Sequence, residues 1–272
     1  MMKNKAVLKR ISKGDILIFL TGLVLCTYPV VSNHIEYKNQ KNVISTYESD
    51  YSKFNDQQIE IEKEKAKQWN ENLYIAQKGI KSYDAAEYEH ILNISNGVMA
   101  SLEIPQIDVN LPIYHGTSDD ILSVGVGHLS ETSLPIGGSN THCVLTGHRG
   151  LPSSKLFTRL DELEKGDLFY IHVFNEIHAY KINGIKVIDP EDTMGFEIED
   201  GQDKVSLITC TPYGINTQRL VVTGCRVKYS VKEKETIKKK LPSLREIIFV
   251  MIPVVFLFFA VIYFLERRMI NE

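Results

Sequence analysis

The chain has 272 residues, a formal net charge of −3 and 24% charged residues. A nucleic-acid-binding surface needs a basic face that displaces counterions, so this balance argues against a nucleic-acid-binding protein. With 43% hydrophobic residues, the chain is able to bury a core of its own.

Two hydrophobic segments flank the polar part of the chain. Residues 16–32 are uncharged and follow a basic N-terminus, and residues 247–265 are uncharged and precede Arg267 and Arg268. Roughly 20 apolar residues cross the ~30 Å hydrocarbon core of a bilayer. We therefore predict two membrane-spanning helices, although a cleaved signal peptide would give the first segment a similar pattern.

Basic residues ahead of a first span keep the N-terminus on the cytoplasmic side. This rule predicts cytoplasmic ends and an extracellular middle part. The predicted organisation, in chain order, is a cytoplasmic N-terminus (1–15), a signal anchor (16–32), an N-terminal helical segment with an atypical lid region (33–95), a catalytic β-barrel (96–230), a charged juxtamembrane linker (231–246), a C-terminal span (247–265) and a cytoplasmic tail (266–272).

Within the helical segment, Glu60–Lys78 is rich in helix-forming residues, and its apolar residues recur near helical spacing. We expect this helix to pack on the following domain through Trp69 and Leu73.

Short apolar or alternating runs follow, separated by Gly, Pro and Asn, as is typical of β-strands and turns. The predicted strands are 98–104, 107–113, 141–146, 167–173, 177–182, 185–188, 204–210 and 219–228. Asn183-Gly184 predicts a hairpin, and leucines at helical spacing predict a short helix over 153–163. This pattern predicts a mainly β fold, either a closed barrel or a sandwich.

The run that ends at Cys210 is followed by a short loop, and Arg219 opens the next run. If the two strands pair antiparallel, Cys210 and Arg219 stand at the same end of the sheet. A guanidinium beside a thiol favours the thiolate and can stabilise an oxyanion. A cysteine near a strand end is, however, more often a packing residue than a nucleophile.

A histidine partner would favour nucleophilic chemistry. His115, His128 and His142 border turns and are chemically able to serve. His148 is preferred because it ends a strand-like run in the sequence Gly147-His148-Arg149-Gly150, where glycines let the backbone bend and expose the imidazole.

These residues carry a resemblance to a known family. Leu207-Ile208-Thr209-Cys210-Thr211-Pro212-Tyr213-Gly214 is similar to the active-site signature of class C sortases, and Thr146–Gly150 resembles their histidine motif. The resemblance extends from about Ile104 to Arg226, and the hydrophobic C-terminal segment also suits class C.

The resemblance implies an eight-stranded sortase-type β-barrel outside the membrane of a Gram-positive bacterium. It implies a cysteine transpeptidase that cleaves an LPXTG-like sorting signal between Thr and Gly and transfers the acyl group to a pilin lysine. Its implied partners are pilin subunits and membrane lipid, without nucleic acid, metal or other cofactor. The implied catalytic residues are Cys210 (nucleophile), His148 (general acid and base) and Arg219 (oxyanion and substrate), with Thr209, Thr211 and Tyr213 as substrate-binding residues.

One departure from the family pattern concerns the lid that usually covers the active site. Residues 75–95 contain no Asp-Pro-aromatic tripeptide, and Tyr83-Asp84 is the nearest substitute, which puts autoinhibition by a lid in doubt. Two alternatives to pilin polymerisation stay open: a housekeeping sortase that joins proteins to peptidoglycan, and a catalytically silent peptide-binding protein. Of the other cysteines, we expect Cys143 and Cys225 to be buried free thiols.

Overall fold

The structure, a computed structural model, describes residues 13–80, 82–192 and 195–271. It divides into two units. One combines the two chain ends, Met1–Ile35 and Leu241–Glu272, and the other comprises Glu36–Lys240.

The unit of the chain ends is built from the first part of helix α1 (Lys13–Tyr51), up to Ile35, and from helix α5 (Leu244–Asn271). Both are long and apolar enough to cross a membrane, with mean hydropathies of 1.9 and 2.6 over their apolar stretches. Phe19 and Phe256 stack with ring centroids 5.4 Å apart. A Cβ at Gly22 would lie 3.0 Å from the Phe256 ring, so glycine allows this close approach.

Helix α1 continues beyond the predicted anchor to Tyr51, into the segment predicted to be helical from residue 33. In this continuation Gln40, Ile44 and Tyr47 are buried, and their spacing places them on one helix face. The Tyr47 hydroxyl donates to the Met99 carbonyl at 3.0 Å and accepts from the Phe174 amide at 3.1 Å. Past its apolar part the helix is therefore held by contacts with the residues of the strand segment 98–104 and with the turn at Phe174.

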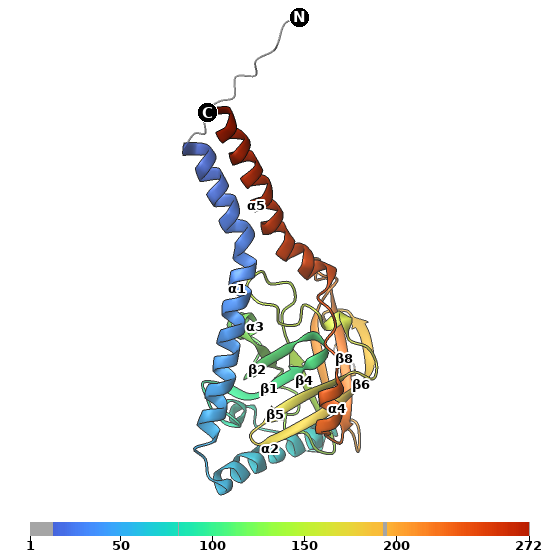
Figure 1. Ribbon diagram of the computed structural model, residues 1–272. Helices are drawn as coiled ribbons and strands as arrows, with labels where there is room; N and C mark the ends of the chain where they lie inside the picture. The colour runs from blue at the N-terminus through green and yellow to red at the C-terminus, as the bar shows by residue number, and fades with distance from the viewer. Residues whose placement is uncertain (1–12, 81, 193–194, 272) are drawn as a thin grey trace, which may run out of the picture. The chain divides into compact units, whose positions relative to one another are not determined.

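The Glu36–Lys240 unit is organised around a closed barrel of eight strands (Figure 1). The order around the barrel is β1-β2-β3-β4-β7-β8-β6-β5, and β2–β3 and β4–β7 are its parallel pairs. The strands are β1 (Val98–Ile104), β2 (Val109–His115), β3 (Val126–His128), β4 (Thr141–Thr146), β5 (Leu168–Val173), β6 (Glu176–Ile188), β7 (Asp203–Thr211) and β8 (Gln218–Val227). The eight-stranded barrel that the resemblance implied is confirmed.

Most strand predictions hold. β1 and β4 occupy the predicted residues, and β2, β5, β7 and β8 lie within two residues of their predicted bounds. β3 was missed, because a three-residue strand is too short to show an alternating pattern.

The hairpin predicted at Asn183-Gly184 is wrong. Residues 176–188 form one strand, β6, whose two halves pair with β8 on either side of a register shift between Ile182 and Gly184. The additional residue is absorbed as a β-bulge, which leaves the strand direction unchanged.

The helix predicted over 153–163 is also wrong. This segment is irregular apart from a 3-10 turn, η3 (Leu160–Glu162). Leu156 has a φ of +39°, which an α-helix cannot accommodate. Its leucines are buried, at 3% exposure for Leu156 and 0% for Leu160, but they reach the core from a loop.

Helix α2 (Asp56–Gln77) begins one turn before the predicted helix, at a capping box formed by Asn55 and Gln58, and ends one residue before its predicted end. Trp69 and Leu73 are buried in the barrel core, as predicted. The Asn70 side chain accepts from the Leu134 amide at 2.7 Å and donates to the Leu134 carbonyl at 3.3 Å. Packing and these bonds fix α2 to the barrel.

The shorter elements complete this unit. They are the 3-10 turns η1 (Ala85–His90) and η2 (Pro105–Ile107) and the helices α3 (Asp119–Val124) and α4 (Val231–Thr236). After α4 the chain is bonded back to the barrel, where the Lys240 amide donates to the Gln106 carbonyl at 2.7 Å.

A buried polar cluster joins η1 to the barrel. The Tyr88 hydroxyl lies 2.9 Å from His128 Nδ1 and accepts from the Gly116 amide at 2.9 Å. His128 is fully buried, and its Nε2 lies 2.9 Å from the Ser133 carbonyl oxygen. Burial lowers the pKa of His128 from 6.5 to about 4, because a charged imidazolium would lose its hydration there.

This shift predicts an acid-sensitive fold. Between pH 6.5 and 4 the unfolded chain binds a proton at His128 that the folded chain excludes. The contribution of neutral His128 to the free energy of unfolding is therefore complete above pH 6.5. It is lost as the pH falls toward 4, to an extent of ~3 kcal/mol. In chemical unfolding of the full chain in detergent micelles, the free energy of unfolding should decline less steeply with falling pH for His128→Gln than for wild type over this range. Parallel pH profiles for the two proteins would contradict the assignment.

Candidate active site

Cys210 and Arg219 lie directly opposite each other. β7 pairs antiparallel with β8, and Cys210 is the register partner of Arg219, as predicted from the sequence. Paired residues project from the same face of a sheet. Val205, Leu207 and Thr209 of β7 are buried toward the core side, so alternation along the strand turns Cys210 and Arg219 to the outer surface of the barrel wall.

His148 lies on the other side of Cys210. β4 runs parallel to β7 with Thr146 opposite Ile208, and the Gly147 amide extends this ladder by donating to the Ile208 carbonyl at 3.0 Å. Continued by one more step, the register places His148 level with Cys210. His148, Cys210 and Arg219 thus form a row across three adjacent chain segments, and each of them is half-buried.

The glycines beside His148 have different physical roles. A Cβ at Gly147 would lie 2.8 Å from the Phe157 ring, so Gly147 allows the close approach of that core side chain. Gly150 has a φ of +79°, a conformation that favours glycine. The prediction that glycines bend the chain at this point therefore holds for Gly150, whereas Gly147 serves packing.

Arg219 is held by the loop that it closes. Its guanidinium donates to the backbone carbonyls of Gln218 at 3.1 Å and Asn216 at 3.4 Å. These bonds fix the cation beside the β7–β8 loop, on the face of the sheet that carries Cys210.

The three predicted substrate-binding residues have different surroundings. Thr209 is 1% exposed, and its hydroxyl donates to the Gly147 carbonyl at 2.7 Å. Thr209 therefore supports the turn that carries His148, and this buried position disfavours the predicted contact with substrate. Thr211 and Tyr213 are half-exposed and lie within three residues after Cys210, and their predicted contact with substrate remains a proposal.

Arg149 was missed as a site residue. Its side chain is only 3% exposed and forms an ion pair with Asp161. One of its terminal nitrogens donates to the Thr211 hydroxyl at 3.0 Å and to the Cys210 carbonyl at 3.4 Å. The sequence showed Arg149 next to His148 but contained no signal that its side chain reaches β7.

The other candidate histidines are structural. The ring nitrogens of His115 lie 2.7 Å from the Ile91 carbonyl and 3.1 Å from the Gly97 carbonyl. Those of His142 lie 3.0 Å from the Glu197 carbonyl and 2.9 Å from the Ser206 hydroxyl. His128 is also buried, as described above. His148 therefore remains the candidate partner of Cys210.

The two other cysteines of the barrel are free thiols. Cys143 is 2% exposed in the core, and burial raises the pKa of its thiol well above the usual value, so it is a poor nucleophile. Cys225 is half-buried rather than buried and accepts a hydrogen bond from the side-chain Nδ2 of Asn183 at 3.0 Å.

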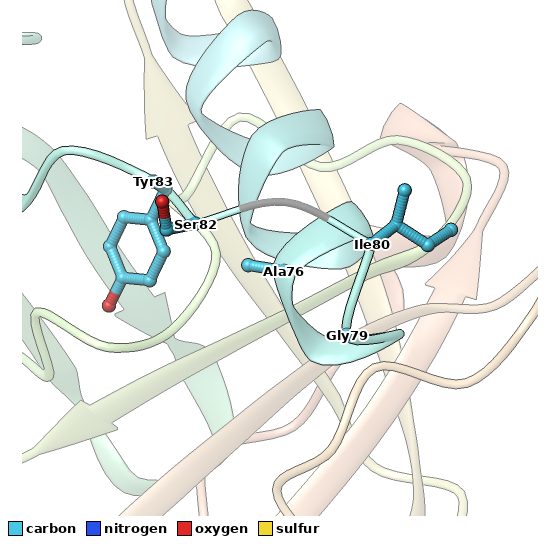
Figure 2. Close-up of a pocket in the computed structure, with 5 residues that line it drawn as sticks. All are labelled: Ala76, Gly79, Ile80, Ser82 and Tyr83. Atoms are coloured by element: carbon cyan, nitrogen blue, oxygen red, sulfur yellow. The ribbon is translucent and has the colours of Figure 1, made fainter.

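Among the described residues 13–80, 82–192 and 195–271, no group of three His, Cys, Asp or Glu side chains is arranged to hold a metal ion. An open pocket of about 470 Å³ adjoins the end of α2 and is lined by Ala76, Gly79, Ile80, Ser82 and Tyr83 (Figure 2). This lining contains no residue of the row and no pairing of a nucleophile with a base, so the pocket is not the candidate active site.

Part of the chain matches a known protein family. The sortase domain family matches residues 102–227. Over 129 residues the chain is 36% identical to sortase D of Bacillus subtilis, a match that covers 46% of this chain and 62% of that protein, less than two thirds of its length.

Two solved structures match over almost their whole length. Sortase C1 of Streptococcus agalactiae has a TM-score of 0.65 and 37% identity, with 70% of this chain and 100% of that chain covered. Sortase C of Streptococcus pneumoniae has a TM-score of 0.62 and 38% identity, with 71% and 97% covered. With the closed barrel and the pairing of Cys210 with Arg219, these matches show that the chain belongs to the sortase family of cysteine transpeptidases, and within it to class C.

Proposed function

We propose that this chain polymerises pilin subunits by transpeptidation. It would cleave an LPXTG-like sorting signal between Thr and Gly, hold the acyl group as a thioester on Cys210 and transfer it to the ε-amine of a pilin lysine. The observation that carries the proposal is the register pairing of Cys210 with Arg219. The β4–β7 register, continued past Gly147, supports His148 as their neighbour. The similarity to a pneumococcal sortase C described in terms of pilin substrate specificity supports the choice of acceptor.

In the first half-reaction the Cys210 thiolate attacks the Thr carbonyl carbon of the sorting signal. The tetrahedral oxyanion that forms is stabilised by the Arg219 guanidinium across the β7–β8 pair. When the C–N bond to Gly breaks, the imidazolium of His148 protonates the departing amine. The product is a thioester, which retains part of the free energy of the cleaved peptide bond.

In the second half-reaction a lysine ε-amine attacks the thioester carbonyl. Neutral His148 accepts the amine proton, the C–S bond breaks, and Cys210 returns to the thiolate. The new bond is an isopeptide, so repeated cycles would build a covalent chain of subunits. Thr211 and Tyr213, half-exposed beside Cys210, would contact the sorting signal.

We further propose that α1 and α5 anchor the enzyme in the cell membrane and leave residues 33–246 outside. The apolar stretches of the two helices and the basic residues ahead of the first stretch support this topology. Membrane anchoring suits a substrate that arrives at the cell surface.

The active site is proposed to be open, because the aromatic residues of the segment before β1 are engaged elsewhere. Tyr83 packs edge-on against Trp69 with ring centroids 5.3 Å apart, and Tyr88 is buried against His128. Neither of these side chains is free to cover Cys210.

The central test is polymerisation by the full chain in detergent micelles with a pilin that carries a sorting signal and an acceptor lysine. Covalent ladders are expected for wild type and for Cys225→Ala, a matched control that removes another half-buried thiol of the same sheet. Cys210→Ala should give none. A thioester resolved only by glycine-type amines would instead favour a housekeeping sortase. Peptide binding without any acyl-enzyme would favour a silent binding protein.

Thr209→Val should destabilise the protein, because it leaves the Gly147 carbonyl without its donor at a buried position. The expected cost is ~1–3 kcal/mol in the free energy of unfolding, together with slower acylation as the His148 turn loosens. Thr209→Ser, which keeps the hydroxyl, should retain most of both. Thr223→Val is a control at another hydroxyl of this sheet, bonded to Ser206 at 2.8 Å. Equal acylation by Thr209→Val and wild type would argue against a supporting role for Thr209.

Tyr83→Ala tests whether the segment before β1 restrains the site. Acylation should stay within about twofold of wild type, as expected for a substitution that touches no reacting group. Deletion of the whole segment is a poorer test, because Tyr88 and Leu92 belong to the core and their loss would unfold the barrel. An increase in acylation much above twofold would reveal a lid that involves Tyr83.

A further inference from the structure

The proposed chemistry assigns no role to Arg149, although its guanidinium contacts the backbone of Cys210 and the side chain of Thr211. The side chain is 3% exposed, and it follows His148 directly in the chain. Burial of a guanidinium is unfavourable unless an opposite charge and hydrogen bonds compensate it, so the partners of Arg149 bear on its role.

The contacts of Arg149 join three segments. One terminal nitrogen donates to the Thr211 hydroxyl at 3.0 Å and to the Cys210 carbonyl at 3.4 Å, both at the end of β7. The other terminal nitrogen pairs with the carboxylate of Asp161 in η3. The guanidinium carbon lies 5.8 Å from the centre of the Tyr213 ring in the β7–β8 loop.

We infer that Arg149 is a positioning residue of the proposed transpeptidase, one that fixes Cys210 relative to His148. The inference rests on the proposed function. Arg149 is bonded to the Cys210 backbone, and its own Cα is one peptide unit, about 3.8 Å, from that of His148. A single guanidinium therefore ties the nucleophile to the general acid, while Asp161 holds the guanidinium in place.

The planar guanidinium suits this task. It presents several N–H donors in a fixed fork and bonds two partners along two directions at once. A lysine at position 149 would keep the charge, but it would present one ammonium on a flexible stem and would not hold β7 and η3 at the same time.

Arg159 provides a matched control in the same stretch of chain. It is as buried as Arg149, at 7% exposure for each residue. It donates to Glu162 at 3.0 and 2.7 Å and to the Lys240 carbonyl at 3.3 Å. These partners do not include Cys210, His148 or Arg219. Arg159→Lys therefore reports the general effect of changing a buried, paired arginine.

The experiment measures kcat and KM for acylation by a sorting-signal peptide, together with thermal unfolding, for the full chain in detergent micelles. Arg149→Lys should lower kcat about 10- to 100-fold, or ~1.4–2.8 kcal/mol, with KM close to wild type. Arg159→Lys should melt similarly but keep kcat within about threefold of wild type. In Arg149→Ala, millimolar ethylguanidinium should restore part of kcat, whereas ethylammonium should not.

If kcat falls in both Arg149→Lys and Arg159→Lys in proportion to the loss of thermal stability, the inference is overturned in favour of a structural role. A raised KM with unchanged kcat would overturn it in favour of substrate binding.

The rate at which iodoacetamide alkylates Cys210, measured in a Cys225→Ala background, distinguishes failure of the positioning inference from failure of the proposed function. The alkylation rate should differ from the parent protein in Arg149→Lys and not in Arg159→Lys, whether or not the peptide is turned over. Equal rates in all three proteins would overturn the positioning inference. Normal alkylation without acylation in the parent protein would overturn the proposed function alone.

Discussion

The register of β7 within the barrel wall is the constraint on which the candidate site depends. β7 is held on one side by six register pairs with β4 and on the other by eight with β8. Because side chains alternate along a strand, a slip by one residue would turn Cys210 into the core and Thr209 outward. Burial of Val205 and Leu207 opposes such a slip, and so does the hydrogen bond from Thr209 to Gly147. The hydrophobic packing that stabilises the barrel therefore also sets the position of the nucleophile.

Burial separates the reactive groups from the structural ones. His128 and His142 are buried, and burial lowers the pKa of each, so both remain neutral and serve as hydrogen-bonding groups within the fold. Cys143, one strand away from Cys210, is kept unreactive in the same way. Cys210 and His148 stay half-exposed at the surface of the barrel, where a substrate can reach them.

The site was more predictable from the sequence than some of the surrounding structure. The pairing of Cys210 with Arg219 follows from two apolar runs joined by a short loop, because the strand period and the turn together set the register. The bulge in β6 was not predictable, since Asn183-Gly184 is equally compatible with a hairpin until the partner strand β8 is known. Likewise, Leu156 and Leu160 have helical spacing, but tertiary burial overrides that local pattern. Arg149 was missed because its partners, Thr211 and Asp161, lie far from it in the sequence.

The most direct measurement of the central claim is the identification of the atom that carries the acyl group. The full chain in detergent micelles is mixed with a sorting-signal peptide, quenched with acid and digested, and the acylated fragment is sequenced by mass spectrometry. The account predicts a hydroxylamine-sensitive adduct of the peptide, truncated after its Thr, on Cys210. An adduct on Cys143 or Cys225, or none on any cysteine, would contradict it.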